Sequence, residues 1–232
     1  TGFSTVSATF MVVVAKTLDL MGRWNFYFWT ALIITFIVTA ITARIFPLSS
    51  IPNECMEGVE PSPEETISTN RFQTAWNEAI TVAGNSGSVL KNIWSSAKDG
   101  GRMISTILPT IMSIGLTGML LALFTPIFKV IGYIFVPFAW IVRLPEAVVA
   151  GQALATSIAE MFLPAAFVVN ASIQTRYVVA TVCISEILFF SASIPCILST
   201  KIPVKIPQIL LLWVERVILS ILLAGIVALI AF

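Results

Sequence analysis

The sequence contains no histidine, and its three cysteines, Cys55, Cys183 and Cys196, form no Cys-x-x-Cys pair. Without histidine, the chain cannot build a Ser-His-Asp or Cys-His catalytic group or a zinc site held by imidazole. Scattered cysteines do not support a disulfide framework, and two of them lie in apolar runs, where small apolar packing is the expected role. We therefore expect no enzyme, no catalytic residues, no metal site and no cofactor.

Charge is also scarce, at 11% of the residues, compared with about a quarter in an ordinary soluble domain. The 13 basic and 12 acidic residues give a net charge of +1, which provides no basic field for binding nucleic acid. Hydrophobic residues make up 57% of the chain, and the mean hydropathy is +0.96. This composition predicts an integral membrane protein whose surroundings are the lipid bilayer.

A membrane-spanning helix needs about 20 mainly apolar residues. Four uninterrupted stretches meet this requirement: 25–46, 103–125, 177–198 and 206–232. Two further apolar stretches, 126–142 and 146–170, contain prolines or polar residues, as is typical of broken or re-entrant helices beside a cavity. The predicted fold class is an all-α, polytopic transmembrane helix bundle with broken or re-entrant helices.

The chain divides into three predicted regions. Residues 1–46 hold two membrane segments, and residues 103–232 form the main membrane unit. The chain begins inside an apolar run without the basic region or cleavage site of a signal peptide, so we expect more membrane-embedded sequence before it. Between the two lies the polar region 47–102, an acidic loop followed by an amphipathic helical pattern from Phe72 to Ala97. Trp76 and Trp94 suit a membrane interface, and residues 84–87 are expected to divide the pattern into two helices.

Glu160 is the most informative polar residue in the apolar runs, since an ionised carboxylate inside a bilayer costs about 2.5–3.5 kcal/mol even on lenient scales. Gln152, Thr156 and Glu160 are spaced i, i+4, i+8 and would form one polar stripe on a helix. Pro164 cannot donate to the carbonyl of Glu160, which would free that oxygen if the helix continues as far as Pro164. The pattern predicts a site for a cation or polar solute; the alternative is a packing network with a simple proline kink.

Glu186 is the second candidate, as the one charge in an otherwise neutral stretch. It is interpreted as a proton site or a partner of Arg143 or Arg176, or alternatively as a carboxyl kept neutral by burial. Asn170 could contribute an amide, whereas Glu215 and Arg216 are expected to form an ordinary interfacial ion pair. The predicted substrate- or ion-binding residues are Glu160, Gln152, Thr156, Ser157, Asn170 and Glu186.

Several motifs resemble the bacterial Gate-domain, or nucleoside-recognition, membrane proteins, and most closely the YjiH-like family. They are Gly101-Arg-Met-Ile-Ser-Thr-Ile-Leu-Pro109 through Gly115, then Leu144-Pro-Glu146, and Glu160-Met-Phe-Leu-Pro164. The likeness covers about residues 68–232, and residues 1–46 resemble the end of a preceding Gate unit. The resemblance implies a multi-pass protein of the cell (inner) membrane, and a second copy or a second Gate-containing subunit as partner.

The leading functional hypothesis is secondary transport of a small polar solute, nucleoside-like or other, with a coupled cation or proton. Substrate would bind between the broken segment 146–170 and its neighbours. The alternative is a non-transporting membrane scaffold or complex subunit, as the spore-maturation relatives of Gate proteins suggest. The two hypotheses differ in whether the polar stripe faces a water-accessible cavity or a packed helix.

Overall fold

The computed structural model describes residues 7–50, 71–198 and 204–232. Within these ranges the chain forms α-helices, short 3-10 helices and turns, and no β-strand, so the predicted all-α class is confirmed. The chain divides into two compact units: one comprises Thr1–Pro52 and Thr110–Phe232, and the other Asn53–Pro109.

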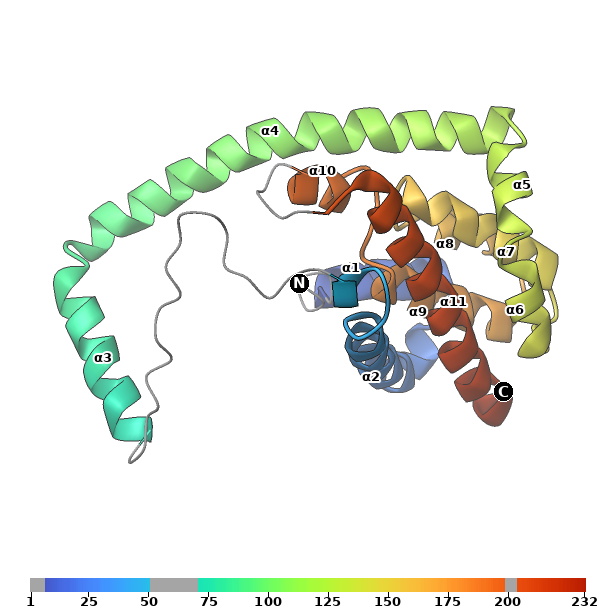
Figure 1. Ribbon diagram of the computed structural model, residues 1–232, viewed down its shortest axis with the longest axis horizontal. Coiled ribbons are helices and arrows are strands. Elements are labelled where there is room, and N and C mark those ends of the chain that lie inside the picture. Colours follow the sequence, from blue (N-terminus) through green and yellow to red (C-terminus); the bar gives the residue numbers. More distant parts are fainter. Residues whose placement is uncertain (1–6, 51–70, 199–203) are drawn as a thin grey trace. The chain divides into compact units, whose positions relative to one another are not determined.

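The first unit is a bundle of long helices and short helical pieces (Figure 1). Its elements are α1 (Ala8–Thr17), η1 (Met21–Arg23), α2 (Trp24–Thr42), η2 (Leu48–Ser50), the end of α4 (Val89–Phe124), α5 (Ile127–Gly132), α6 (Val136–Ile141), α7 (Ala147–Ala155), η3 (Thr156–Ile158), α8 (Leu163–Phe167), α9 (Ile173–Ser185), α10 (Ser193–Leu198) and α11 (Ile206–Ala231).

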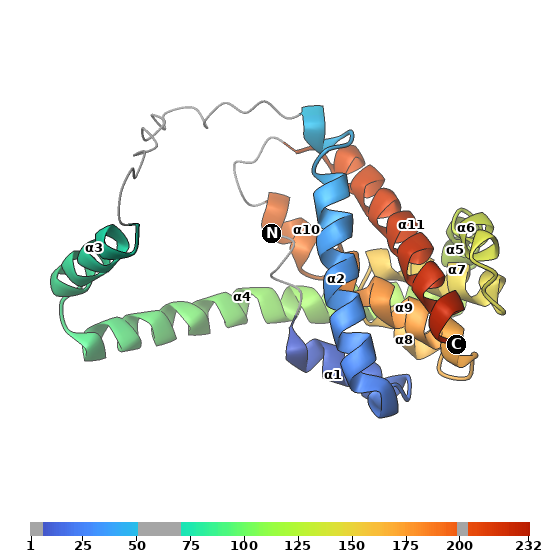
Figure 2. The same cartoon turned by 90° about the horizontal axis from the view of Figure 1, so that it is seen from below.

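The centre of this bundle is α9, which packs against α2, α7, α8 and α11 (Figures 1 and 2). Its helix begins at Ser172, whose hydroxyl accepts the Thr175 N–H at 3.4 Å as an N-cap. Every residue from Tyr177 to Ser185 is buried, because these neighbouring helices cover α9. A helix that is apolar all round belongs in a core, and this one has neighbours on each face.

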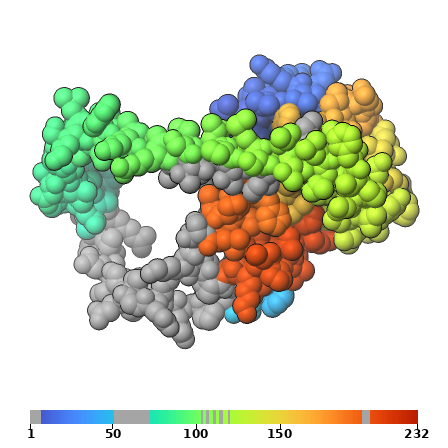
Figure 3. All heavy atoms as spheres, turned by 90° about the horizontal axis from the view of Figure 1, so that it is seen from above, coloured from blue at the N-terminus to red at the C-terminus, as the bar shows by residue number. Residues whose placement is uncertain are grey.

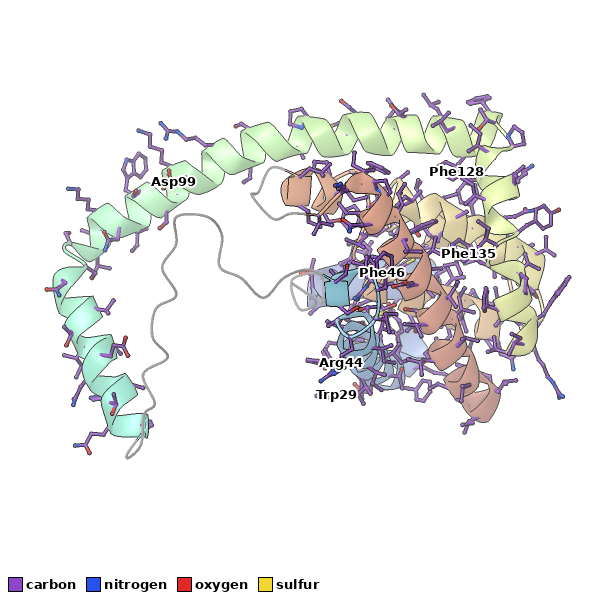
Figure 4. All side chains as sticks on the ribbon, in the orientation of Figure 1. Trp29, Arg44, Phe46, Asp99, Phe128 and Phe135 are labelled. Atoms are coloured by element: carbon purple, nitrogen blue, oxygen red, sulfur yellow. The ribbon has the colours of Figure 1, made fainter. Side chains whose placement is uncertain are left out.

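Two helices among the described residues are long and apolar enough to cross a membrane: η1 with α2, Met21–Thr42, and α11. They correspond to the predicted spans 25–46 and 206–232. Large apolar side chains cover the outer face of each helix; Trp29, labelled in Figure 4, is 59% exposed, and Ile230 is 83% exposed.

Small residues let the short helices approach one another closely. A Cβ on Gly132 of α5 would lie 2.5 Å from Cα of Gln152 on α7, and one on Gly118 of α4 would collide with Cβ of Ala159. The space-filling view shows the yellow-green segment around α5 and α6 lying directly against the golden α7 segment (Figure 3). Gly151 and Ala159 therefore lie at close helix contacts, where small residues let backbones approach.

The predicted interruptions are partly correct. Residues 146–170 form α7, η3 and α8 in place of one continuous helix, and 126–142 form α5 and α6. The expectation of one continuous helix over 177–198 is wrong, because α9 ends at Ser185 and α10 begins at Ser193. Among the described residues, three of the predicted apolar stretches are therefore interrupted, 126–142, 146–170 and 177–198, where two interruptions were predicted.

In the second unit, α3 (Arg71–Asn85) precedes the start of α4, which is 36 residues long and contains Pro109. The two helices meet at a turn where Gly87 has a φ of +75°, a conformation that glycine adopts without strain. This confirms the predicted division of the amphipathic pattern, although the acidic loop lies mainly outside the described residues. Trp76 and Trp94 are 59% and 75% exposed.

We expect Trp76 and Trp94 to lie at lipid headgroup depth, since exposed indoles favour the membrane interface. Variants that retain only one of them, with the remaining tryptophans changed to Phe, should be quenched in vesicles by a probe held at headgroup depth. A probe at the end of the acyl chains should quench them less. The placement would be contradicted if the shallow probe left both indoles unaffected.

Gly132→Ala should lower the free energy of unfolding by about 1–3 kcal/mol, the usual cost of overpacking, because its Cβ would meet the backbone of α7. Thermal or denaturant unfolding of the purified protein measures this change. Gly22→Ala is the matched control, because no heavy atom lies within 4 Å of a Cβ there. Equal stability of the two variants would disprove the close contact.

Candidate functional site

The interrupted segments 146–170 and 177–198 are joined by hydrogen bonds at the points where their helices end. The Phe190 N–H donates to the carbonyl of Ile158 at 2.7 Å, and the Ser191 N–H donates to that of Ala159 at 3.0 Å. These hydrogen bonds connect the break after α9 to the break after η3. Non-helical backbone inside a core needs such partners, since each buried N–H or carbonyl without one is costly.

The end of α9 has an unusual backbone. Ile187 adopts a φ of +52°, and the Leu188 N–H turns back to the carbonyl of Glu186 at 2.8 Å. A left-handed conformation is strained for a β-branched residue and persists only where surrounding contacts hold it. Strain of this kind is concentrated at functional sites, which makes the break at Glu186 a candidate.

Glu186 is completely buried beside this break. Its Oε2 accepts the indole N–H of Trp213 on α11 at 2.9 Å, and the same N–H lies 3.1 Å from Oγ of Ser157. Its Oε1 has no hydrogen-bond partner among the described residues. The carboxylates of Glu186 and Glu160 are near enough to repel one another, and the Arg216 cation attracts the Glu186 carboxylate.

The indole of Trp213 is itself held in place by packing. Phe135, which precedes α6 and is labelled in Figure 4, contacts it edge to face with ring centroids 5.3 Å apart. Both side chains are almost fully buried. The donor to Glu186 is therefore positioned by an aromatic pair in a geometry that such rings prefer.

The Arg216 side chain donates hydrogen bonds to the carbonyls at the end of α9. Its Nε donates to the carbonyls of Ser185 and Glu186 at 2.9 and 3.1 Å, and Nη2 donates to the Ser185 carbonyl as well. Its remaining donors reach Thr42 and Thr39 on α2, each at 3.2 Å. A helix leaves its last carbonyls without internal partners, and a cation there also complements the helix dipole.

Three hydroxyls, of Ser185, Ser191 and Ser220, complete the buried cluster, which we define as Ser157, Ser185, Glu186, Ser191, Trp213, Arg216 and Ser220. Ser185 donates to Ser220 on α11 at 2.6 Å. Ser191, in the break before α10, is 1% exposed, and its Oγ has no partner among the described residues. The cluster thus contains two buried oxygens, Glu186 Oε1 and Ser191 Oγ, that have no hydrogen-bond partner among the described residues.

Glu160 lies in the turn between η3 and α8, so the helix does not continue to Pro164 and the condition for a free carbonyl is not met. That carbonyl accepts the Leu163 N–H at 3.2 Å, because α8 begins anew instead of continuing α7. The side chain accepts the Phe162 N–H at 2.7 Å. Pro164 occupies the first turn of α8, where a missing N–H does no harm, so it is not a kink in a longer helix.

The predicted polar stripe divides between two places, because η3 is a 3-10 turn and changes the register. Gln152 and Thr156 line a cavity of about 120 Å³ between α4, α5, α7 and α8, whereas Glu160 lies in the turn between η3 and α8. Ser157, which was not part of the stripe, joins the buried cluster. Asn170 is exposed in the turn between α8 and α9 and lies outside the cluster. The predicted binding roles of these residues remain predictions, but the residues lie in different surroundings.

Other charged residues have structural roles. The predicted partners of Glu186 are wrong, because Arg143 is exposed, and Arg176 donates to the Leu18 carbonyl at 2.9 Å and pairs with Asp19 at 3.8 Å. The predicted Glu215–Arg216 interfacial pair is wrong too, since Arg216 is only 3% exposed and faces α9. Neighbouring residues on a helix point in different directions, so adjacency along the chain does not imply pairing.

Glu146, in the turn before α7, fastens that turn to the start of α9. It accepts the hydroxyls of Ser172 and Thr175 at 2.7 and 2.6 Å and the Ser172 N–H at 3.3 Å. Burial acts to raise the pKa of this carboxyl, but these hydrogen bonds outweigh it and lower the pKa below its ordinary value. The turn is therefore held by a carboxylate that is ionised at neutral pH.

Sequence reasoning missed Trp213 and Arg216, although a signal was present. Trp213, Arg216 and Ser220 recur at i, i+3 and i+7 on an otherwise apolar helix, which places them on one inward face. Ser191 gave no such signal, because its burial depends on the backbone bonds between the two breaks.

Comparison with known proteins identifies no family and no function. No family model and no solved structure matches the chain. An uncharacterised protein of Alkalihalophilus pseudofirmus is 29% identical to it over 227 residues, which cover 95% of this chain and 48% of that protein. The chain thus spans about half the length of the curated relative it matches.

Arg216→Met should cost about 3 kcal/mol or more of folding free energy, because it leaves the last carbonyls of α9 and the Glu186 carboxylate without their cation. The measurement is denaturant unfolding of the purified protein. Arg44→Met serves as the control, since Arg44 is exposed and donates only to the nearby Ala40 carbonyl. A loss for Arg216→Met no larger than that for Arg44→Met would refute this role.

Proposed function

We propose that the chain forms part of a multi-pass inner-membrane protein that transports a small polar solute, driven by a coupled proton or cation. Supporting the membrane location are the two long apolar helices and the large exposed apolar side chains on α2, α5, α6 and α11. Such a surface is unsuited to water but suits lipid. The segments α5–α6 and α7–α8 consist of helices too short to cross a bilayer singly.

The observation that carries the proposal is the crossing of two interrupted segments beside a buried carboxylate. In secondary transporters, discontinuous helices meet near the middle of the membrane, and their unwound backbone surrounds the substrate and coupling-ion sites. Here the break after η3 and the break after α9 are hydrogen-bonded to each other, and Glu186 lies beside them with one oxygen open. An ionisable residue in such surroundings is a functional hypothesis by default.

Glu186 is the group that would carry the coupled proton or cation. An ionised carboxylate that is fully buried needs full compensation, whereas the side chain that donates to Glu186, the indole of Trp213, is neutral. Arg216 does not bond to its carboxylate, because its donors are used by carbonyls and hydroxyls. Glu160 adds a second carboxylate nearby, and binding one positive charge would relieve the repulsion between them.

Transport also requires that the bundle adopt two arrangements. Binding at the site must favour one arrangement over the other. Two backbone hydrogen bonds, from Phe190 and Ser191, join the breaks, and Ile187 holds a strained conformation. A joint of this kind can rearrange at modest cost, whereas the long helices α2, α9 and α11 form a fixed frame around Arg216.

The second candidate is a non-transporting membrane scaffold, and the Arg216 network favours it. That network ties α2, α9 and α11 together in the way a static core would. In this case Glu186 would be a neutral packing group, and its open oxygen would have no ligand. The charge of Glu186 would then have no functional consequence.

Glu186→Gln should fold normally yet reduce coupled uptake into proteoliposomes at least tenfold, because glutamine keeps the shape but cannot bind a proton or balance a cation. Glu160→Gln should also reduce uptake. A screen of amino acids, organic acids, nucleosides and metal ions by thermal shift identifies the solute to use.

Glu78→Gln is the matched control, because Glu78 is exposed on α3. Wild-type uptake by both Glu186→Gln and Glu160→Gln would eliminate the coupling site. If Glu186→Gln does not fold, Glu186→Asp, which keeps the charge, separates the two candidates: uptake with altered ion dependence supports transport, and the absence of uptake by both the wild-type protein and this variant supports the scaffold.

A further inference from the structure

A cavity of about 120 Å³ lies on the opposite side of η3 from Glu186, within the first unit. Its walls come from the end of α4, from α5, from α7 with η3, and from α8. Apolar side chains form most of the wall, including Phe128, which is labelled in Figure 4, Val149 and Phe167. The polar groups in the wall are Lys129, Gln152 and Thr156. A mainly apolar wall with a few convergent polar groups is the usual composition of a small-molecule site.

The three polar side chains offer complementary chemistry. Lys129 is exposed and carries a positive charge with three N–H donors. The Thr156 hydroxyl gives its hydrogen to the Ala153 carbonyl at 2.7 Å, so toward the cavity it can only accept a hydrogen bond. Gln152 can both donate and accept. The site therefore suits a ligand that has an anionic end for Lys129 and a hydrogen-bond donor for Thr156.

The volume limits the size of that ligand. At about 30 Å³ per water molecule in the liquid, the cavity has room for on the order of four water molecules. A nucleoside, with its base and ribose, is too large for this space. A two- or three-carbon acid with one further polar group fits, and its hydrocarbon part would contact Phe128 and Val149.

We propose that this cavity binds a small carboxylate bearing a hydroxyl or amino group on the adjacent carbon, such as a short 2-hydroxy or 2-amino acid. Lys129 receives the carboxylate, Thr156 accepts the hydroxyl or amino hydrogen, and Gln152 bonds the remaining carboxylate oxygen or substituent. That this acid is also the solute carried rests on the proposed transport function, whereas the binding itself does not depend on transport.

The position of η3 provides the link to the buried carboxylate. Thr156 faces the cavity, whereas the next residue, Ser157, contacts the indole N–H that also bonds to Glu186. The carbonyl of Ile158, the last residue of η3, accepts the N–H of Phe190 from the other break. A shift of this single 3-10 turn on ligand binding would therefore reach Glu186 directly. Short 3-10 stretches within helices often mark hinges.

The first experiment measures thermal shift and calorimetric affinity for lactate, alanine, propionate, inorganic phosphate and uridine. Lactate or alanine should bind, and propionate, which lacks the donor for Thr156, should bind at least tenfold more weakly. Binding of phosphate or uridine at the affinity of lactate would overturn the assignment, as would the absence of binding by both lactate and alanine.

Variants then test the residues. Lys129→Met should weaken lactate binding at least tenfold, whereas Lys98→Met, an exposed lysine of α4 in the second unit, should leave it unchanged. Thr156→Val should remove the preference for lactate over propionate. This readout is insensitive to a general loss of stability, because it compares two ligands on one protein. Unchanged affinity in Lys129→Met, or unchanged preference in Thr156→Val, would refute the proposal.

Two further measurements distinguish the acid site from a lipid site, and binding from transport. A lipid headgroup could also supply an anion to Lys129, so binding is compared in nanodiscs with and without anionic lipid; loss of lactate binding in the anionic discs would overturn the proposal.

Retained binding in Glu186→Gln, together with lost uptake, supports both proposals. Lactate binding without uptake by the wild-type protein would refute transport but uphold the cavity assignment.

Discussion

The arrangement of this bundle depends on one buried cation. The Arg216 guanidinium lies between α11, α2 and the end of α9, and its planar set of donors reaches two carbonyls and two hydroxyls on separate elements. A lysine could not do this, because its ammonium is a compact point charge without a fixed fork of donors. By satisfying the last carbonyls of α9, Arg216 allows that helix to end inside the core at Ser185.

The break after α9 has chemical consequences, because a carboxylate lies directly at it. Glu186 caps the end of α9 and faces Trp213, while the following residues turn away to bond with the break after η3. The positive charge of Arg216 is close enough to stabilise the carboxylate without bonding to it. Glu186 is therefore held in position by the Trp213 indole, while its Oε1 has no hydrogen-bond partner among the described residues.

Close helix contacts and the cavity arise from the same use of small residues. Gly132 and Gly151 bring α5 against α7, and Gly118 brings α4 against Ala159. Where larger side chains such as Phe128 and Phe167 follow, the helices are held apart, and the space between them becomes the cavity beside Gln152 and Thr156. The single turn η3 then separates an outer polar site from an inner one, with Thr156 in the first and Ser157 in the second.

The sequence alone determined the all-α class, the two long apolar helices, the amphipathic region and the interruption of 146–170, because each follows from local composition, periodicity and proline placement. It also identified Glu160 and Glu186 as unusual, because charges are rare in apolar runs. It did not predict the break at Glu186, since no proline or glycine marks it; the backbone bonds to Ile158 and Ala159 and the guanidinium of Arg216 stabilise it from distant parts of the chain. The helical stripe of Gln152, Thr156 and Glu160 failed for the same reason: regular spacing assumes a continuous helix, and only tertiary contacts decided where the helix stops.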